Sequence, residues 1–404
     1  MKYDFTTIYD RRGCDALAVD CPPPGMPRGM EPRFPAIPMW VADMSFATAP
    51  AVCRAIEQRL RHPLFGYFEP GREYYDAILR WQSRRNGVEG LEDRHIGYEN
   101  GVLGGVLSAL NVLCGRGDEV LLHAPTYIGF TSSLERNGLR IVHSPLARDE
   151  NGVWRMDFED MERKLRERRI HAAVFCSPHN PTGRVWERWE IERAMELFRK
   201  YDVYVVSDEI WSDLTLFDNR HIPTQSVSAD ARDRTVALYA PTKTFNLAGL
   251  VGSYHIIYND LLRDRVERAG KTDHYNEMNV LSMHALIGAY SDEGGEWADE
   301  LRGVLSGNAD WACRYIAERF HGVSAARPQG TYMLFPDCAD WCAAHGATMD
   351  ELLRRGYEAG VLWQDGRAFH GAHHIRINLA LPKAKLEEAF ERLDRYVFNA
   401  PEGR

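Results

Sequence analysis

The chain has 404 residues and a mass of 46.2 kDa, with 45% hydrophobic and 26% charged residues. This size allows one large domain and a smaller one, each around its own core. The formal net charge of -9 and the pI near 5.9 argue against a nucleic-acid partner. No apolar stretch approaches the roughly 20 residues that span a bilayer, and the first five residues lack a signal-peptide pattern. We therefore expect a cytoplasmic protein without a membrane partner.

The first 45 residues are irregular and rich in proline, which predicts a segment that wraps over a surface. Helical periodicity then appears over 51–61, 74–85 and 104–113. Apolar, strand-like runs that alternate with helical segments follow over 119–123, 140–143, 172–176, 203–207, 235–239 and 253–258. This alternation predicts an α/β fold with βαβ units and a mainly parallel sheet.

The pattern changes after about residue 281. A long amphipathic helix is predicted over 296–320, strands over 330–335 and 374–379, and a last helix over 386–397. These elements indicate a second, smaller α+β domain. We expect an N-terminal segment (1–45) packed against that small domain (286–404), and a large domain over 46–285.

Cysteine and histidine give no indication of a metal centre. Eight cysteines are scattered without a CxxC pair, so neither a disulfide framework nor a structural zinc site is predicted. His370, His373 and His374 lie close in sequence, but no acidic or cysteine ligand pattern accompanies them. We interpret these histidines as loop and strand-edge residues and expect no metal.

Lys243 directly follows the apolar run 235–239 and its short extension Ala240-Pro241-Thr242. Of the 49 lysines and arginines only seven are lysines, so the chain generally uses arginine where it needs positive charge. Lysine can lose its proton when it is desolvated and condense with a carbonyl, whereas arginine cannot be deprotonated in a protein. The lysine at this position predicts a Schiff base to an aldehyde cofactor.

Two further polar residues follow strands in the same way. The run 172–176 leads to Asn180, and the run 203–207 ends at Asp208. Ligands of open parallel sheets bind beyond the carboxyl ends of the strands, so an amide, a carboxylate and the amine of Lys243 should converge. Pyridoxal phosphate needs such a set: an amine for its aldehyde, a carboxylate for its pyridine nitrogen and a donor for its phenolate oxygen. Alone, Asp208 would be a helix cap and Asn180 a turn residue; their joint occurrence favours the cofactor.

At this point the chain resembles the fold-type I pyridoxal-phosphate enzymes, and most closely the MalY/PatB-like C-S β-lyases of the class I/II aminotransferase superfamily. The resemblance covers nearly the whole chain and rests on an ordered set of motifs, namely Met39-Trp40-Val41-Ala42-Asp43-Met44, Phe65-Gly66-Tyr67, 177–186, Ser207-Asp208-Glu209-Ile210, 240–250 and Ile375-Arg376-Ile377-Asn378-Leu379-Ala380. It implies a fold-type I aminotransferase-like fold, with a large, mainly parallel-sheet domain and a smaller α+β domain.

The resemblance also implies how the cofactor is bound. Lys243 would link to it covalently, Asp208 would pair with its pyridinium, Asn180 would bond its phenolate oxygen and Tyr127 would stack on its ring. The phosphate would meet the backbone amides of Gly101, Val102 and Leu103 at a helix start, where unpaired N–H groups favour an anion, and the hydroxyl of Thr242.

Two more roles concern groups outside the cofactor ring. Arg376 resembles the residue that binds the substrate α-carboxylate, to which a guanidinium makes two parallel hydrogen bonds. Tyr67 resembles a tyrosine that reaches the phosphate of the neighbouring subunit's cofactor. The resemblance therefore implies a homodimer with its active site at the interface.

The chain departs from the pattern at three positions. Val251 stands where many aminotransferases carry a phosphate-binding arginine, although C-S lyases also tend to lack it. Trp211 stands where aminotransferases often have a phenolate-bonding tyrosine, and Ser45 replaces an acidic residue. These departures concern the second contact to the cofactor oxygen and the substrate side near the N-terminus.

The function that the resemblance implies is α,β-elimination from cystathionine, cysteine or a related sulfur amino acid, giving pyruvate, ammonia and a thiol. An aminotransferase is the alternative, because the same early carbanion can be protonated on the cofactor instead. A non-catalytic pyridoxal-phosphate-binding regulator is a third hypothesis. The intact Lys243 and the missing DNA-binding extension disfavour it.

Overall fold

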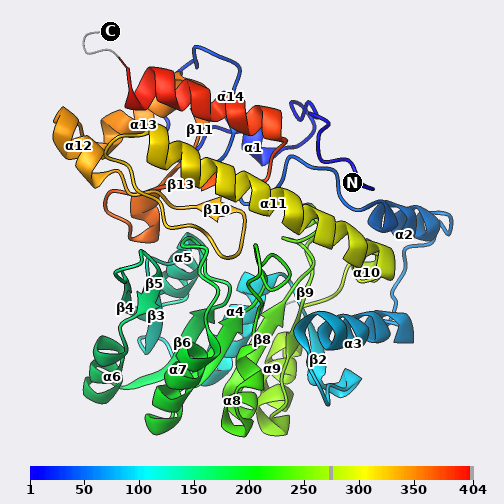
Figure 1. The fold of residues 1–404 in the computed structure, drawn as a ribbon. Helices are drawn as coiled ribbons and strands as arrows, with labels where there is room; N and C mark the ends of the chain where they lie inside the picture. Colours follow the sequence, from blue (N-terminus) through cyan, green and yellow to red (C-terminus); the bar gives the residue numbers. More distant parts are fainter. Residues whose placement is uncertain (273–275, 401–404) are drawn as a thin grey trace.

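An eight-stranded sheet lies at the centre of the computed structural model, which describes residues 1–272 and 276–400. Its strand order is β2-β9-β8-β7-β6-β3-β4-β5, and Figure 1 shows it with its covering helices. The strands are β2 (Ile96–Glu99), β3 (Glu119–Ala124), β4 (Arg140–Arg148), β5 (Trp154–Met156), β6 (Ile170–Cys176), β7 (Tyr204–Asp208), β8 (Thr235–Tyr239) and β9 (Ser253–Ile256).

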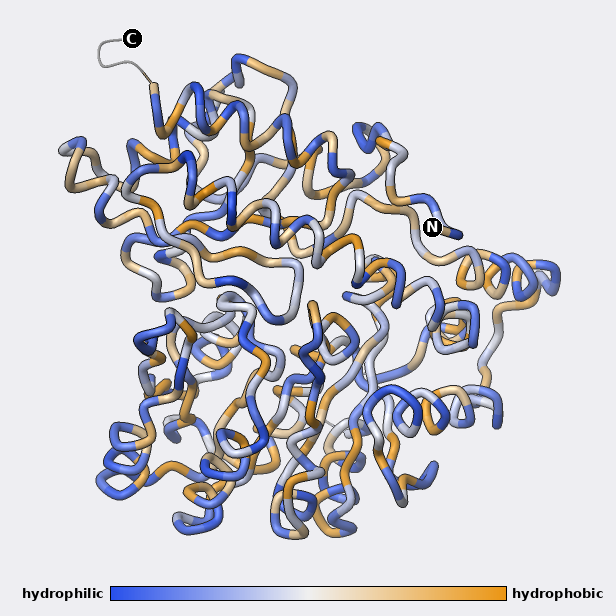
Figure 2. Tube along the Cα trace, in the orientation of Figure 1, coloured by the Kyte–Doolittle hydropathy of each residue, from blue (hydrophilic) through white to orange (hydrophobic). Residues whose placement is uncertain are grey.

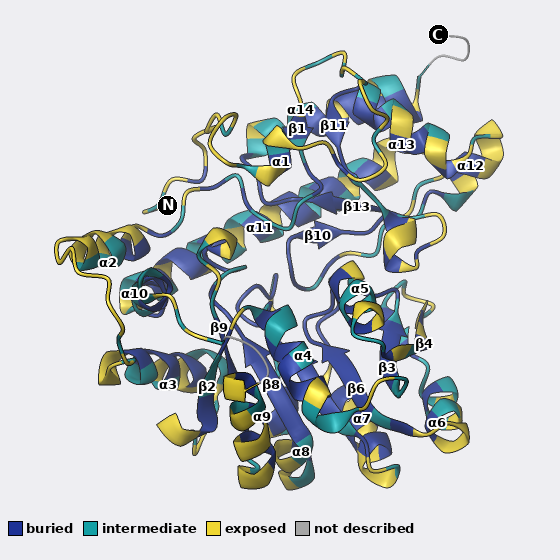
Figure 3. Ribbon diagram, turned by 180° about the vertical axis from the view of Figure 1, so that it is seen from behind, coloured by how far each residue is buried: buried dark blue, intermediate teal, exposed yellow. Residues whose placement is uncertain are grey.

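Helices cover both faces of this sheet because successive strand residues point to opposite faces. On one face, alternate strand residues such as Val120 and Leu122 pack with α4 (Val102–Leu113), α5 (Ile128–Arg136) and α9 (Asp260–Thr272). On the other face, the intervening residues pack with α6 (Phe158–Glu167), α7 (Arg188–Lys200) and α8 (Ala229–Arg234). The strands are therefore buried, and the outward sides of the helices are polar and exposed (Figures 2 and 3).

The C-terminal part forms a second layer above the carboxyl edge of the sheet (Figure 1). It contains the short strands β10 (Met333–Leu334), β12 (Gln364–Asp365) and β13 (Ile375–Asn378) in the order β10-β13-β12. Its helices are α11 (Asp292–Arg319), α12 (Ala339–His345), α13 (Met349–Glu358) and α14 (Lys383–Leu393).

The N-terminal segment contacts this second layer. It holds the short helix α1 (Leu17–Asp20), and β1 (Ile37–Pro38) pairs in parallel with β11 (Val361–Leu362). Helices α2 (Pro50–Leu60) and α3 (Arg72–Asn86) follow this segment in the chain. Helix α10 (Val280–Ala289), which comes after the central sheet, packs against both. The division into 1–45, 46–285 and 286–404 stays a prediction.

The α/β fold with a mainly parallel sheet is confirmed, with differences at its edge. Strands β3, β4, β6, β7 and β8 pair in parallel, but β9 runs antiparallel to both β8 and β2. Strand β2, which has four residues, and helix α10 were not predicted from the sequence. Helix α10 is apolar around most of its circumference because α2, α3 and α11 surround it, so it lacks the amphipathic period.

In 1–272 and 276–400, no helix is both long and apolar enough to cross a membrane. The same ranges contain no cluster of three or more histidine, cysteine, aspartate or glutamate side chains that could hold a metal. Of the three histidines discussed above, His374 stacks on Phe335 at 4.5 Å between ring centroids, and His370 lies 4.3 Å from the ring of His143.

The long helix α11 supports the second layer through its buried face, and Leu301 on that face is fully buried. We predict that Leu301→Ala lowers the free energy of unfolding by about 2–5 kcal/mol, because it leaves a cavity in the core. Glu318→Ala, at an exposed position of the same helix, should change it by less than about 0.5 kcal/mol. Denaturant unfolding of both variants measures the difference, and equal losses would contradict this packing.

Candidate active site

A cavity of about 290 Å³ opens at the carboxyl ends of the parallel strands. Residues from the ends of β6, β7 and β8, from the start of α4 and from the N-terminal segment line it. They include nearly all the residues expected at a cofactor site, namely Gly101, Val102, Leu103, Tyr127, Asn180, Asp208, Thr242 and Lys243, together with Ala42, Cys176, Trp211 and Val251. The convergence expected from the sequence is thus observed, while the role of each residue stays a prediction.

Lys243 lies in the loop after β8 and points into this cavity. Its Nζ donates a hydrogen bond to the carbonyl oxygen of Ala42 at 2.8 Å, and lies 5.8 Å from the ring centre of Trp211. Burial, followed by the positive charge of Arg376, lowers the pKa of Lys243 to about 8. About a tenth of this amine is therefore unprotonated, and nucleophilic, at pH 7, far more than of an ordinary lysine.

Asp208 is the last residue of β7 and is only 5% exposed. Its Oδ1 accepts a hydrogen bond from the amide of Ile210 at 3.1 Å. Burial raises the pKa of Asp208 to about 7, against the opposing effects of that hydrogen bond and of Lys243. A cationic nitrogen beside the carboxylate would hold it in its charged form, so the site suits a protonated pyridine.

Arg376, on β13, is 3% exposed and does not line this cavity itself, but it contacts Asn180, which does. Its Nη1 donates to Oδ1 of Asn180 at 3.3 Å, and its Nη2 donates to the carbonyl oxygen of Trp40 at 2.9 Å and to Gln364. Its Nε has no partner in the described part of the chain. Burial lowers the pKa of Arg376 to about 10, which still leaves it charged at neutral pH. A substrate carboxylate would compensate this desolvated charge.

Asn180 lines the cavity and contacts Arg376 of the C-terminal layer. Its side-chain oxygen faces Arg376, which leaves the amide nitrogen as the group that can donate towards a phenolate. Asn180 is 4% exposed, and it lies in the loop that follows β6. The same loop is fixed by the backbone hydrogen bond from Gly183 to His179 at 2.8 Å.

The start of α4 lies at the edge of the cavity. Gly101, at the N-cap, has a φ of 76°, a conformation that favours glycine, and no side chain caps the helix. The amide of Gly101 donates to the carbonyl oxygen of Glu99 at 2.8 Å. The first-turn amides of Val102 and Leu103 have no intrahelical acceptor, so they are the ones that fit a phosphate, together with the Thr242 hydroxyl.

Tyr127 lines the opposite wall, at the N-terminus of α5. Its ring meets Phe130 edge-on, with 5.4 Å between centroids. A Cβ at Gly129 would lie 2.3 Å from a carbon of the tyrosine ring, so glycine at that position leaves room for the ring. The ring is therefore held in a fixed place at the cavity wall, where a planar cofactor could stack on it.

The three positions that depart from the family pattern lie at or near the cavity. Trp211 is 2% exposed and lines it, but its ring packs edge-on against Tyr332 at 4.7 Å. Val251 also lines the cavity, with a φ of 31°, which is strained for a β-branched residue. Ser45 contributes its backbone amide to the carbonyl oxygen of Ala380 at 2.9 Å.

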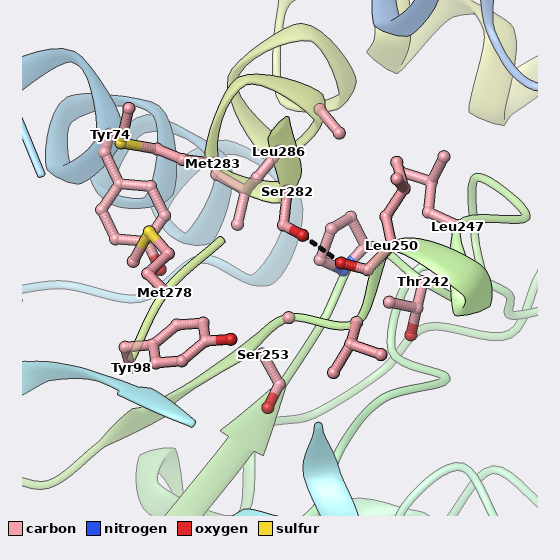
Figure 4. Close-up of a pocket in the computed structure, with 14 residues that line it drawn as sticks. Tyr74, Tyr98, Thr242, Leu247, Leu250, Ser253, Met278, Ser282, Met283 and Leu286 are labelled. Carbon is pink, nitrogen blue, oxygen red and sulfur yellow. Dashed lines mark hydrogen bonds between the residues drawn. The ribbon is translucent and has the colours of Figure 1, made fainter. Parts of the chain in front are cut away.

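A second, smaller cavity lies beside the first and shares Thr242, Val251 and Gly252 with it. Figure 4 shows this smaller cavity. Its lining is mainly apolar, and its volume of about 20 Å³ is too small for a cofactor. Oγ of Ser282 donates a hydrogen bond to the carbonyl oxygen of Leu250, another lining residue, as the dashed line in Figure 4 shows. The larger cavity is therefore the candidate active site.

Two predicted site residues, Tyr67 and Arg376, do not line this cavity. Arg376 is adjacent to it through its contact with Asn180, whereas Tyr67 is fully exposed, in a loop between α2 and α3. Two groups that the sequence reasoning missed are the carbonyl oxygen of Ala42 and the hydroxyl of Tyr332, which donates to it at 3.0 Å. The motif around Met39 indicated that this segment matters, but a backbone carbonyl gives no signal of its own in a sequence.

The residues present fit pyridoxal phosphate by their chemistry. The helix start without a side-chain cap suits a phosphate, the buried carboxyl of Asp208 suits a cationic ring nitrogen, and the amine of Lys243 suits an aldehyde. These three groups come from three different segments of the sheet layer, namely the start of α4, the end of β7 and the loop after β8.

Comparisons with known proteins agree with this fit. The family model of the class I and II aminotransferases matches residues 37–393. Cystathionine beta-lyase PatB of Bacillus subtilis is 33% identical over 361 residues, covering 89% of this chain and 92% of that protein. Protein MalY of Escherichia coli is 30% identical, with 96% of each chain covered.

A solved structure matches almost the whole fold. Cystalysin of Treponema denticola, crystallised with a pyridoxal 5'-phosphate cofactor, superposes with a TM-score of 0.90 at 28% identity, over 98% of each chain. The family model and the two relatives cover the cavity, the sheet and the C-terminal layer together. The chain therefore belongs to the class I and II aminotransferase family, in the branch that contains PatB and MalY.

Proposed function

We propose that this protein is a pyridoxal-phosphate-dependent C-S β-lyase. It would carry out α,β-elimination on cystathionine, cysteine or a related sulfur amino acid to give pyruvate, ammonia and a thiol. The observation that carries the proposal is the amine of Lys243, desolvated at the carboxyl edge of the sheet opposite the carboxyl of Asp208. The relatives named cystathionine β-lyase support it.

When bound, pyridoxal phosphate supplies an aldehyde that takes up amines and a ring that accepts the electron pair of a carbanion. Lys243 would hold the cofactor at its aldehyde carbon, and its free nitrogen would serve as the base that takes the substrate α-proton. The Cβ–S bond then breaks, and the thiolate leaves with the electron pair. Lys243 thus serves as both anchor and general base.

The other residues bind and orient. Arg376 holds the α-carboxylate, so that the α-hydrogen is directed to the amine, and Asp208 keeps a proton on the ring nitrogen. Asn180 donates its amide to the phenolate oxygen. The first-turn amides of α4 and Thr242 hold the phosphate, and Tyr127 covers the ring.

We further propose that the active unit is a homodimer in which Tyr67 reaches the phosphate bound by the partner. Its full exposure supports this, because Leu60, Leu64 and Phe65 in the same stretch are also large, apolar and exposed. Such a stretch is typical of a surface that a second subunit covers. The expected cytoplasmic location stays a prediction.

The reaction type is tested by incubating the purified protein with cystathionine, with and without a keto-acid acceptor. We expect pyruvate and free thiol to form at the same rate in both conditions, because elimination needs no second substrate. New amino acid that depends on the acceptor, without release of thiol, would make the protein an aminotransferase instead.

The pKa of Lys243 predicts the pH dependence of cofactor attachment. Because the pKa of Lys243 is lowered to about 8, its amine becomes nucleophilic as the pH rises through 8. An ordinary lysine loses its proton only at a pH about two units higher. The rate at which cofactor-free protein binds pyridoxal phosphate covalently should therefore rise between pH 7 and 8.5 and then level off, as followed by absorbance. A rate that keeps rising to pH 10 would contradict a desolvated amine.

The Lys243→Ala variant should form no covalent link to the cofactor, and its turnover should fall by at least about 10³-fold.

Arg376→Lys tests the carboxylate site. Lysine keeps the charge but cannot make two parallel hydrogen bonds, so KM for the sulfur amino acid should rise by about 10- to 100-fold. Arg263→Lys, at a buried arginine of α9 away from the cavity, is the matched control and should leave KM unchanged. If both variants keep the KM of the parent protein, Arg376 does not bind the carboxylate.

A further inference from the structure

The carbonyl oxygen of Ala42 receives two hydrogen bonds from side chains that are far apart in sequence. Nζ of Lys243 donates to it at 2.8 Å, and the hydroxyl of Tyr332 donates to it at 3.0 Å. Because a carbonyl oxygen has two lone pairs, both donors can be accommodated together. The phenol oxygen and the lysine nitrogen are therefore neighbours at one wall of the cavity.

This carbonyl is held in a fixed orientation by its own segment. The side-chain amide of Asn378 donates to the carbonyl oxygens on either side, those of Val41 at 2.7 Å and Asp43 at 2.5 Å. The side chain of Asn246 accepts from the amide of Met44 at 3.0 Å. With the peptide groups on both sides fixed in this way, the oxygen of Ala42 is a preorganised acceptor.

Tyr332 is equally constrained. It is 1% exposed, its ring packs edge-on against Trp211, and its backbone oxygen accepts from the amide of Leu379 at 2.8 Å. Burial raises the pKa of Tyr332 well above the ordinary value of a phenol, so the group stays protonated and acts as a donor at neutral pH. The hydroxyl donates its hydrogen to the carbonyl oxygen of Ala42.

We propose that Tyr332 is a positioning residue for Lys243, and that it acts through the shared carbonyl oxygen of Ala42. The inference rests on the proposed function, in which the substrate amine displaces the lysine. With one lone pair taken by Tyr332, the other is directed at the lysine nitrogen, which stays at the cavity wall, within reach of the α-proton, instead of adopting other rotamers. No part of this role requires Tyr332 to touch the substrate.

The hydroxyl also affects the protonation of Lys243. Its partly positive hydrogen points at the oxygen that would otherwise stabilise an ammonium, so it disfavours the charged amine. Removing the hydroxyl should therefore raise the pKa of Lys243. The other charged or titratable groups that face the amine are Arg376 on β13, Asp208 on β7, Asp43 in the N-terminal segment, and Tyr127 and Cys176 on the cavity wall.

The test compares full-length parent protein with Tyr332→Phe, which removes the hydroxyl and keeps the ring. Cofactor-free protein is mixed with pyridoxal phosphate between pH 6 and 10, and the rate of covalent attachment is followed by absorbance. We expect the pH midpoint of the variant to lie about half a unit or more above that of the parent. In the cofactor-loaded variant we expect kcat for the sulfur amino acid to fall about 3- to 10-fold with KM unchanged.

Tyr357→Phe is the matched control, because Tyr357 is also 1% exposed and its hydroxyl has no hydrogen-bond partner in the described ranges. It should keep the midpoint and kcat of the parent. A Tyr332→Phe protein with the parent's midpoint and kcat would overturn the proposal, and so would a change in KM alone. If the parent itself forms no link at Lys243, the proposed function fails, and this outcome is distinct from either result for Tyr332.

Discussion

The desolvation of one amine is the constraint on which the rest of this structure depends. Lys243 lies at the carboxyl edge of a buried sheet, where loss of water and the nearby charge of Arg376 hold its pKa near 8. A lysine in water would be almost wholly protonated at neutral pH and a poor nucleophile. The fold therefore contributes to the chemistry by keeping this amine dry while leaving it open to the cavity.

The two layers of the molecule supply opposite parts of the site. The parallel strands deliver Asn180, Asp208 and Lys243 to one edge, as the topology of an open sheet requires. The C-terminal layer supplies Arg376, which is far from these three residues in sequence and is brought close to Asn180 by the fold. Side-chain amides and hydroxyls from both layers fix the N-terminal segment, which is why its backbone, rather than its side chains, contacts the lysine.

A site residue could be predicted from the sequence where it directly follows a strand of the sheet, and could not where it comes from another part of the chain. Asn180, Asp208 and Lys243 could be predicted because each follows an apolar strand, and the sheet then brings them together. Arg376 could be proposed only from the family resemblance, since no local pattern links β13 to the sheet. The antiparallel direction of β9 was not predicted, because the direction of a strand does not change its pattern of apolar residues. Strand β2 was not predicted because four residues are too few to show a clear alternation of apolar and polar side chains. The contact of Tyr332 with Ala42 could not be predicted, because a backbone carbonyl is present at every residue.

The central claim is that the amine of Lys243 is the point of covalent attachment. The most direct measurement is to reduce the cofactor-loaded protein with borohydride, digest it and locate the pyridoxyl group by mass spectrometry. We predict the label on the peptide that contains Lys243 and on no other lysine of the chain. A label on another lysine, or a cofactor released without any label, would contradict the account.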